Sequence, residues 1–360
     1  MAVSSAGVRR RLAICAAAVL LFVAHPSTQD ALVDPARAPL PDPAPVVMKA
    51  WGQMPAGRVW GVSGAVEIGP DGNIWTYDRC GANTCVGSDL DPILEFDRRT
   101  GRLLASFGKG LFALPHGLHV DRDGNVWVTD AGASPDGTVG HQVIKFDPTG
   151  RVLMRIGTAG RKGSDPGLLN EPCDVVTTRA GDVFVADGHS GQAAAPPPGT
   201  TGRVIKFTKD GKYVKEWGRL GTGRGEFRTP HALALDSRGR LFVADRGNHR
   251  IQIYDQNGTL LEEYRQYGRS SGLFIDGQDR LYSIDADTNG TNHPDWRNGI
   301  RIGTAREDRV LAFIPPFETP NAWGVAGEGV AVDAEGNVYE AAGPLSLPFA
   351  GSGLTRHSAR

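Results

Sequence analysis

Apolar and polar residues alternate in short runs along most of the chain. The stretch LPHGLHVDRDGNVWVTD at residues 114–130 shows the pattern, because two alternating runs flank the turn sequence DGN. Alternation with a period of two predicts half-buried β-strands, and a short Asp/Gly/Asn turn between two such runs predicts a tight β-hairpin. Continuous helical periodicity is hard to find anywhere in the chain. We therefore expect an all-β protein.

The hairpin pattern recurs as an internal repeat. Six copies align without gaps, and they begin at Gly64, His116, Cys173, His231, Ser271 and Glu328. A third alternating run follows most copies and a fourth follows several, such as QVIKFD at residues 142–147 and VLMRIG at residues 152–157. Six units of four strands predict a six-bladed β-propeller with four-stranded antiparallel blades. The last copy lacks a clear fourth strand, whereas VVMKAWG at residues 46–52 resembles one, so we expect the N-terminal strand to close the last blade.

The two ends of the chain have a different composition. Three arginines at residues 9–11 precede the apolar run LAICAAAVLLFVA, which predicts an export signal at residues 1–25, with an uncleaved anchor as the alternative. Residues 26–45 are rich in Pro and Ala and predict a linker. We expect the propeller at residues 46–345 and a flexible tail at residues 346–360. The mature protein would then be periplasmic or extracellular, with no membrane attachment after cleavage.

Composition and charge exclude several classes of protein. The chain has 360 residues, 40% hydrophobic and 22% charged, which is typical of a globular protein. With a formal net charge of −1, nothing in it looks built to hold a nucleic acid. Export implies an oxidising compartment, where a disulfide between Cys80 and Cys85 would pin one loop and leave Cys173 as a small buried apolar side chain. We expect a monomer.

The first residue of each repeat carries the candidate metal chemistry. A propeller places the start of each innermost strand around the central channel, so His116, His231 and Glu328 can converge from three blades. Two imidazoles and a carboxylate suit Zn²⁺ with an open fourth position, and Cys173 is a less favoured fourth ligand. The alternative is that each histidine is an ordinary hydrogen-bonded residue at the end of a strand.

Two arginines occupy a second repeated position. Arg79 and Arg246 directly follow the aspartates that close the first and fourth hairpins, Asp78 and Asp245. Both would leave their strands at the mouth of the channel, and paired guanidinium groups suit a carboxylate. Exposed arginines paired with surface acids are the alternative interpretation.

These residues carry a family likeness. DGNVWVTD and GRLFVADRGNHRIQIYD look like NHL repeats, and residues 62–342 resemble the peptidyl-α-hydroxyglycine α-amidating lyases among NHL proteins. The most specific matches are LPHGLHVDRDGNVWVTD with the following HQVIKFDP, then GKYVKEWG, and then GEFRTPHALAL with VADRGNHRIQ. The resemblance implies a six-bladed propeller whose channel holds a catalytic zinc and a structural calcium.

The resemblance also implies roles for individual residues. Of the family's three zinc-binding histidines, two match His116 and His231, and the third falls on Glu328, whose carboxylate can still bind zinc. The family's two substrate-binding arginines match Arg79 and Arg246. Its catalytic tyrosine falls instead on His189, and a histidine can act as a base near neutral pH.

The calcium site of the family matches only in part. The calcium takes two backbone carbonyls, which correspond to those of Val66 and Leu118, and one aspartate carboxylate. The aspartate falls on Gly329, which has no side chain to offer.

The resemblance favours a zinc-dependent lyase-like enzyme with a small carboxylate-bearing or peptide substrate. It would cleave a C–N bond to release an amide and glyoxylate, with Arg79 and Arg246 holding the carboxylate and His189 taking the α-hydroxyl proton. One alternative is a non-catalytic NHL propeller that binds a peptide, glycan or protein on one face. Another is a metal-dependent hydrolase, such as a lactonase, on the same fold.

Overall fold

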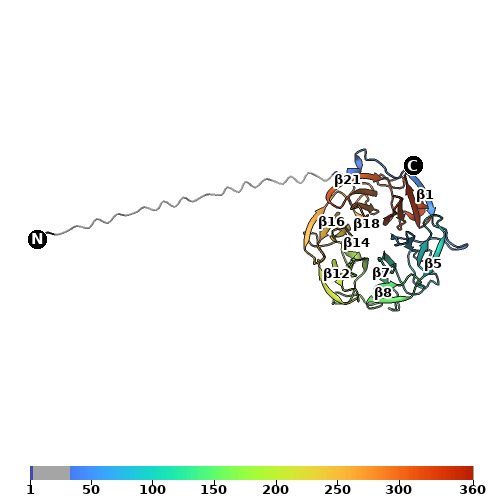
Figure 1. The fold of residues 1–360 in the computed structure, drawn as a ribbon, viewed down its shortest axis with the longest axis horizontal. Coiled ribbons are helices and arrows are strands. Elements are labelled where there is room, and N and C mark those ends of the chain that lie inside the picture. Colours follow the sequence, from blue (N-terminus) through green and yellow to red (C-terminus); the bar gives the residue numbers. More distant parts are fainter. Residues whose placement is uncertain (3–32, 360) are drawn as a thin grey trace. The chain divides into compact units, whose positions relative to one another are not determined.

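The computed structural model describes residues 1–2 and 33–359 of the chain. Within residues 33–359, the strands form six four-stranded antiparallel sheets arranged as the blades of a propeller around a central channel (Figure 1). The prediction of an all-β six-bladed propeller is confirmed. The expected export signal at residues 1–25 falls almost entirely on residues 3–32, which lie outside the described residues. No helix in the described part of the chain is both long and apolar enough to cross a membrane.

The blades follow one another along the chain, and each begins with its innermost strand. The first three blades contain β2 (Val66–Ile68), β3 (Ile74–Tyr77), β4 (Ile93–Phe96) and β5 (Leu103–Phe107); β6 (Pro115–Val120), β7 (Val126–Ala133), β8 (Gly140–Phe146) and β9 (Val152–Gly157); and β10 (Pro172–Thr177), β11 (Val183–Asp187), β12 (Arg203–Phe207) and β13 (Tyr213–Trp217).

The other three blades complete the ring. They contain β14 (Pro230–Leu235), β15 (Leu241–Asp245), β16 (Arg250–Tyr254) and β17 (Leu260–Tyr264); β18 (Ser270–Ile275), β19 (Arg280–Asp285), β20 (Gly299–Thr304) and β21 (Glu307–Ile314); and β22 (Gly329–Val332), β23 (Val338–Ala341), β24 (Leu354–Ser358) and β1 (Val46–Trp51). Short helical turns lie between some strands: η1 (Pro35–Arg37), η2 (His189–Gln192), η3 (Arg246–Asn248) and α1 (Leu347–Ala350).

The last blade joins the two ends of the described chain. Its strand order is β22-β23-β24-β1, so the N-terminal strand supplies the outermost position, which confirms the predicted closure. The expected flexible tail at residues 346–360 is wrong. Strand β24 pairs with both β1 and β23, and Leu354 is fully buried. A strand between two others has its backbone groups paired on both sides and is held firmly.

The expected linker at residues 26–45 also needs correction, because residues 33–45 belong to the compact unit. Asp34 is buried and forms an ion pair of 2.8 Å with the buried Arg301 of β20. Ala44 is buried with side chains of the last two blades, and the carbonyl of Pro41 accepts a hydrogen bond from Phe313 N. Residues 33–45 therefore pack against the fifth blade before β1 joins the sixth.

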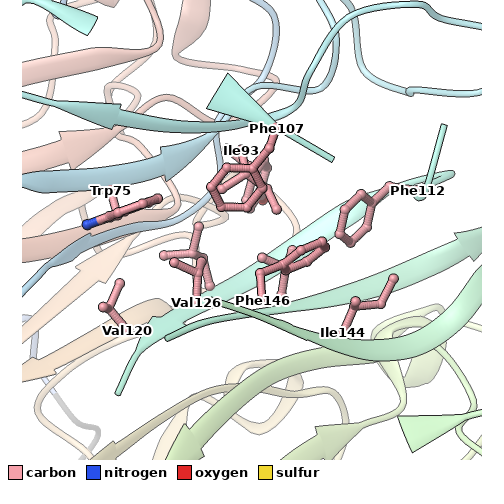
Figure 2. Close-up of a cluster of buried hydrophobic side chains, with 11 residues drawn as sticks. Trp75, Ile93, Phe107, Phe112, Val120, Val126, Ile144 and Phe146 are labelled. Carbon is pink, nitrogen blue, oxygen red and sulfur yellow. The ribbon is translucent and has the colours of Figure 1, made fainter. Parts of the chain in front are cut away.

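Large apolar side chains fill the spaces between neighbouring blades. Figure 2 shows one such cluster, in which Trp75 and Phe107 of the first blade meet Val126 and Phe146 of the second. Fully burying a large apolar side chain contributes about 1.5–3 kcal/mol, so each blade is stabilised mainly by the two beside it. The side chains at the inner ends of the blades are therefore held in fixed relative positions.

Candidate functional site

In four of the described blades, a β-bulge near the start of the innermost strand sets the direction of the side chain at the first position of the repeat. The pairing of β6 with β7 shifts register between Pro115 and Leu118, and that of β14 with β15 shifts between Pro230 and Ala232. Proline removes the backbone N–H that the ladder would otherwise use, and a bulge re-aims the residue that it displaces. The motifs LPHGL and TPHAL therefore release His116 and His231 from the ladder and turn them toward the channel.

Three histidines meet at one end of the channel. The ring centroid of His116 lies 4.7 Å from that of His231 and 4.8 Å from that of His189. One ring nitrogen from each of the three residues lies within 4.8 Å of the other two. His189 comes from η2, directly after β11. The third imidazole thus comes from the third blade, whereas the sequence pattern had predicted a carboxylate from the sixth.

Backbone carbonyls orient two of the rings. His116 Nδ1 lies 2.8 Å from the carbonyl oxygen of Cys173, and His231 Nδ1 lies 2.6 Å from that of Ser271. A carbonyl can only accept, so Nδ1 carries the proton in both rings and each Nε2 keeps its lone pair. His231 Nε2 is buried and has no hydrogen-bond partner among the described residues. An unpartnered lone pair beside two other imidazoles fits a metal ion.

The electrostatics of the cluster also fit a metal. Burial lowers the pKa values of His116 and His231 well below the ordinary value, and burial together with the nearby arginines lowers the pKa of His189 to about 3. All three rings are therefore neutral at physiological pH, which is the form that binds a metal. The low pKa of His189 also makes it a weak proton acceptor, in contrast to the base expected from the resemblance.

Glu328 lies beside this cluster but outside the close group of ligand atoms. It lines the same cavity as His116 and His189, and its Oε1 lies 4.0 Å from Nη1 of Arg246. Cys173 also stays outside the group. Its thiol is free and buried, as expected, and its contribution to the site is the carbonyl that orients His116. The structure therefore favours a ligand set of three histidines.

The two predicted arginines are buried at the same end of the channel. Arg79 Nε donates to the carbonyl of Pro115, Nη1 to Asn83 Oδ1 at 2.6 Å, and Nη2 to the hydroxyl of Tyr77 at 3.5 Å. Asn83 lies in the loop that the Cys80–Cys85 disulfide closes, and this disulfide confirms the pairing expected from the sequence. Arg79 and Arg246 are both buried, so the alternative of exposed arginines paired with surface acids is wrong.

Arg246 is held by residues that the sequence patterns did not single out. Its Nε donates to Gln192 Oε1 at 3.1 Å, and the same oxygen accepts from Arg269 Nη2 at 3.1 Å. Asp287 forms an ion pair with Arg269 and lies 4.0 Å from Arg246. Gln192 is in η2 with His189, so this network joins the third histidine to the second arginine. No repeat column contains Gln192, because the loops between strands differ from blade to blade.

These groups surround one cavity of about 290 Å³. The cavity is lined by Arg79, Asn83, Leu114, His116, His189, Gln192, Arg246, Ala286, Asp287, Ala326, Glu328, Gly343, Pro344 and Leu345. Its size suits a small group or the end of a peptide. Two of the three clustered histidines and both guanidinium groups therefore face the same cavity.

The expected calcium ligands lie in the channel on the other side of the histidines. Val66, Leu118 and Gly329 all line it. Asp174 is a carboxylate in this channel, but its two oxygens accept hydrogen bonds from Val175 N and Leu233 N. Because Ca²⁺ takes six to eight oxygen ligands, the described residues do not fit the family's calcium site.

Comparison with known proteins agrees with this architecture. The NHL repeat family matches residues 227–254. Peptidylglycine alpha-amidating monooxygenase of Rattus norvegicus is 40% identical over 172 residues, covering 46% of this chain and 16% of that protein. Peptidyl-alpha-hydroxyglycine alpha-amidating lyase 1 of Drosophila melanogaster is 30% identical over 266 residues, covering 68% of this chain and 45% of that protein. The chain thus spans about a sixth of the rat protein and less than half of the fly protein.

Solved structures show the same fold at low sequence identity. A gluconolactonase of Xanthomonas campestris is similar with a TM-score of 0.56 and 17% identity, and the match covers 89% of this chain and 97% of that one. At this identity the likeness concerns the fold alone. The sequence relatives and the cavity side chains therefore carry the argument about function.

Proposed function

This chain is an NHL-repeat six-bladed propeller that resembles peptidyl-α-hydroxyglycine α-amidating lyases, and from that premise we propose that it is a zinc-dependent lyase of the same kind. Its substrate is a peptide or small amide that ends in an α-hydroxyglycine carboxylate. The products are the shortened amide and glyoxylate.

One observation carries the proposal: His116 and His189 line the same cavity as the two buried arginines, and a ring nitrogen of His231 lies within 4.8 Å of theirs. Zinc prefers nitrogen ligands in a tetrahedral arrangement, so His116, His189 and His231 would hold it and leave a fourth position open. Bound there, zinc would act as a Lewis acid on the α-hydroxyl group of the substrate.

The arginines account for the carboxylate. The guanidinium groups of Arg79 and Arg246 are fixed by hydrogen bonds to Pro115, Asn83 and Gln192. They need no reorganisation when the anion arrives, and two charge-assisted contacts orient it in the cavity. The reacting C–N bond, one atom away from the carboxylate, is thereby placed beside the three histidines.

The chemistry balances without another reactant. The α-hydroxyl O–H loses its proton, its electrons form the C=O bond of glyoxylate, and the C–N bond breaks. The departing amide nitrogen then takes one proton.

We further propose that the protein acts after export, since the disulfide between Cys80 and Cys85 suits an oxidising compartment.

The test has two parts, metal content and turnover. Protein purified without chelator should hold about one zinc per chain, and His116→Ala should abolish it. The matched control is His119→Ala, on the same strand β6, because His119 bonds Thr177 and lies outside the histidine group. Glyoxylate release from an α-hydroxyglycine-extended peptide should be lost in His116→Ala and in Arg79→Ala and kept in the control.

The outcomes separate the alternatives. A wild-type protein that binds no zinc under any condition contradicts the proposal and favours a binding module. Zinc binding with hydrolysis of esters or lactones, but no release of glyoxylate, favours the hydrolase.

A further inference from the structure

The three-histidine group leaves the site without an assigned proton acceptor. His189, which the resemblance places at the position of a catalytic tyrosine, has its ring in the metal group. Deprotonation of the α-hydroxyl and protonation of the departing nitrogen still require a group that can carry a proton. That group has to face the cavity close to the arginine that holds the substrate.

The cavity has few candidates. Asp287 forms an ion pair with Arg269, so it is committed to a structural partner. Tyr77 lies next to the cavity without lining it, and its hydroxyl accepts a hydrogen bond from Arg79. Burial raises the pKa of Tyr77 above its usual range, so its hydroxyl stays protonated. Among the described residues that line the cavity, Glu328 is the remaining carboxylate.

The position of Glu328 suits proton transfer. Its side chain is 16% exposed, and its Oε1 lies 4.0 Å from Nη1 of Arg246, too far for a hydrogen bond. The carboxylate is therefore close to the substrate-binding arginine without being committed to it. A substrate carboxylate on Arg246 brings its own α-carbon substituents next to Glu328.

Two glycines leave the space that this side chain occupies. A Cβ at Gly343 would lie 2.6 Å from Glu328 Cγ, and a Cβ at Gly64 would lie 2.9 Å from Glu328 Oε2 and collide with the hydroxyl of Tyr77. A Cβ this close would force the Glu328 side chain to move, so glycine at both positions lets the carboxylate keep its present place. Gly64 is the first residue of the first repeat, so the lack of a side chain there has a structural reason.

We propose that Glu328 is the catalytic proton carrier of this site. Resting on the proposed function, the assignment is that Glu328 takes the α-hydroxyl proton as the C=O bond forms and returns it to the departing amide nitrogen as the C–N bond breaks. The residue that the resemblance placed among the zinc ligands and the one that it placed as the base have thus exchanged roles between the sixth and third blades.

The decisive variant is Glu328→Gln, which keeps the size of the side chain and removes its ability to accept a proton. General acid–base catalysis contributes typically 10²–10⁴-fold, so kcat should fall by about 100-fold or more, with KM changed by less than about threefold. The visible absorption of the cobalt-substituted protein, which reports the ligand set independently of turnover, should be the same as in the wild type. His189→Gln should change that spectrum.

A second variant tests the position of the carboxylate. Gly343→Ala should lower kcat with unchanged metal content, because the added methyl group displaces the Glu328 side chain. Gly277→Ala is the matched control, since a Cβ there meets nothing within 4 Å. Thermal unfolding of each variant verifies that it is folded.

Each result has a defined meaning. An active wild type with an equally active Glu328→Gln overturns the assignment alone, and so does a changed cobalt spectrum in that variant, because Glu328 would then be a ligand. A wild type with no lyase turnover overturns the proposed function and the assignment together.

Discussion

His116 Nδ1 lies 2.8 Å from the carbonyl oxygen of Cys173, which belongs to the neighbouring blade. His231 makes the same contact with the carbonyl of Ser271, again in the next blade. Two of the three candidate ligands are therefore oriented by the backbone of a neighbouring blade, so the geometry of the candidate metal site depends on how the blades pack. Substitutions that loosen the packing between blades should consequently weaken metal binding as well as lower stability.

The buried histidines should make the metal-free protein sensitive to acid. Below the ordinary histidine pKa of 6.5, the unfolded chain binds protons that His116, His189 and His231 in the folded chain do not, because their pKa values are lowered, that of His189 to about 3. The free energy of unfolding therefore falls as pH falls below 6.5, by up to about 1.4 kcal/mol per pH unit for each histidine. Urea denaturation of the metal-free protein at pH 7 and 5.5 measures this.

The variant His189→Gln isolates the contribution of this histidine to the pH dependence of stability. It is needed because buried aspartates change the free energy of unfolding in the opposite direction as pH falls. Burial raises the pKa of Asp174 to about 7, so its protonation stabilises the folded state as pH falls. The loss of stability on acidification should be smaller in His189→Gln than in the wild type. Identical losses in the two proteins would show that His189 titrates normally.

The loop closed by the Cys80–Cys85 disulfide should control substrate binding. Asn83 Oδ1 accepts a hydrogen bond of 2.6 Å from Arg79 Nη1. A hydrogen bond to a charged group contributes about 1.5–3 kcal/mol, so Asn83→Ala should raise KM about tenfold or more with a smaller change in kcat. The half-buried Asn73, which bonds Asp71 and does not line the cavity, gives the control variant Asn73→Ala. An unchanged KM in Asn83→Ala would mean that Arg79 does not need this contact.

The repeat made the fold predictable, whereas the position of β24 could not be assigned from the sequence. Each hairpin carries its own turn and alternating runs, so the pattern is local and recurs six times. The strand Leu354–Ser358 is short and lacks a clear alternation, and it is buried because β1 and β23 flank it. That burial comes from pairing with a strand about 300 residues away, a relation that no local pattern contains.

The site was predictable to the extent that it follows the repeat. His116 and His231 share one repeat position, and Arg79 and Arg246 share another. His189 stands two residues after Asp187, the aspartate that closes its hairpin, so it lies one residue beyond the position of the two arginines. Comparing the residues after all the closing aspartates would have placed it at the same end of the channel. Its approach to His116 depends on the turn of η2, which the sequence pattern does not specify.

Asp34 should be a strong determinant of stability although it precedes the first strand. Its ion pair with Arg301 has both side chains fully buried, and removing one partner of such a pair costs about 3–5 kcal/mol. Asp34→Ala should lower the free energy of unfolding by somewhat less than this, because Arg301 Nη1 also lies 3.6 Å from Asp285. In urea denaturation, Asp295→Ala serves as the control, since its pair with Arg37 is exposed and should be worth under about 1 kcal/mol.

Closure of the ring should depend on the side chain of Trp51 in β1. Trp51 is 4% exposed, and its ring centroid lies 5.0 Å from that of Tyr339 in β23, so the indole anchors the N-terminal strand to the last blade. Trp51→Ala should lower the free energy of unfolding by about 3–5 kcal/mol. Met48→Ala in the same strand should change it by less than about 1 kcal/mol, because Met48 is 50% exposed.

The same two variants separate closure from simple loss of a buried side chain. If β1 holds the ring shut, Trp51→Ala should also weaken zinc binding, since a looser sixth blade relaxes the first and fifth blades beside it and, through them, the carbonyl of Ser271 that orients His231. Titration of the metal-free variants with zinc measures this effect, and Met48→Ala should bind as tightly as the wild type. A destabilised Trp51→Ala with unchanged zinc affinity would mean that the blades carrying the histidines keep their geometry without closure of the ring.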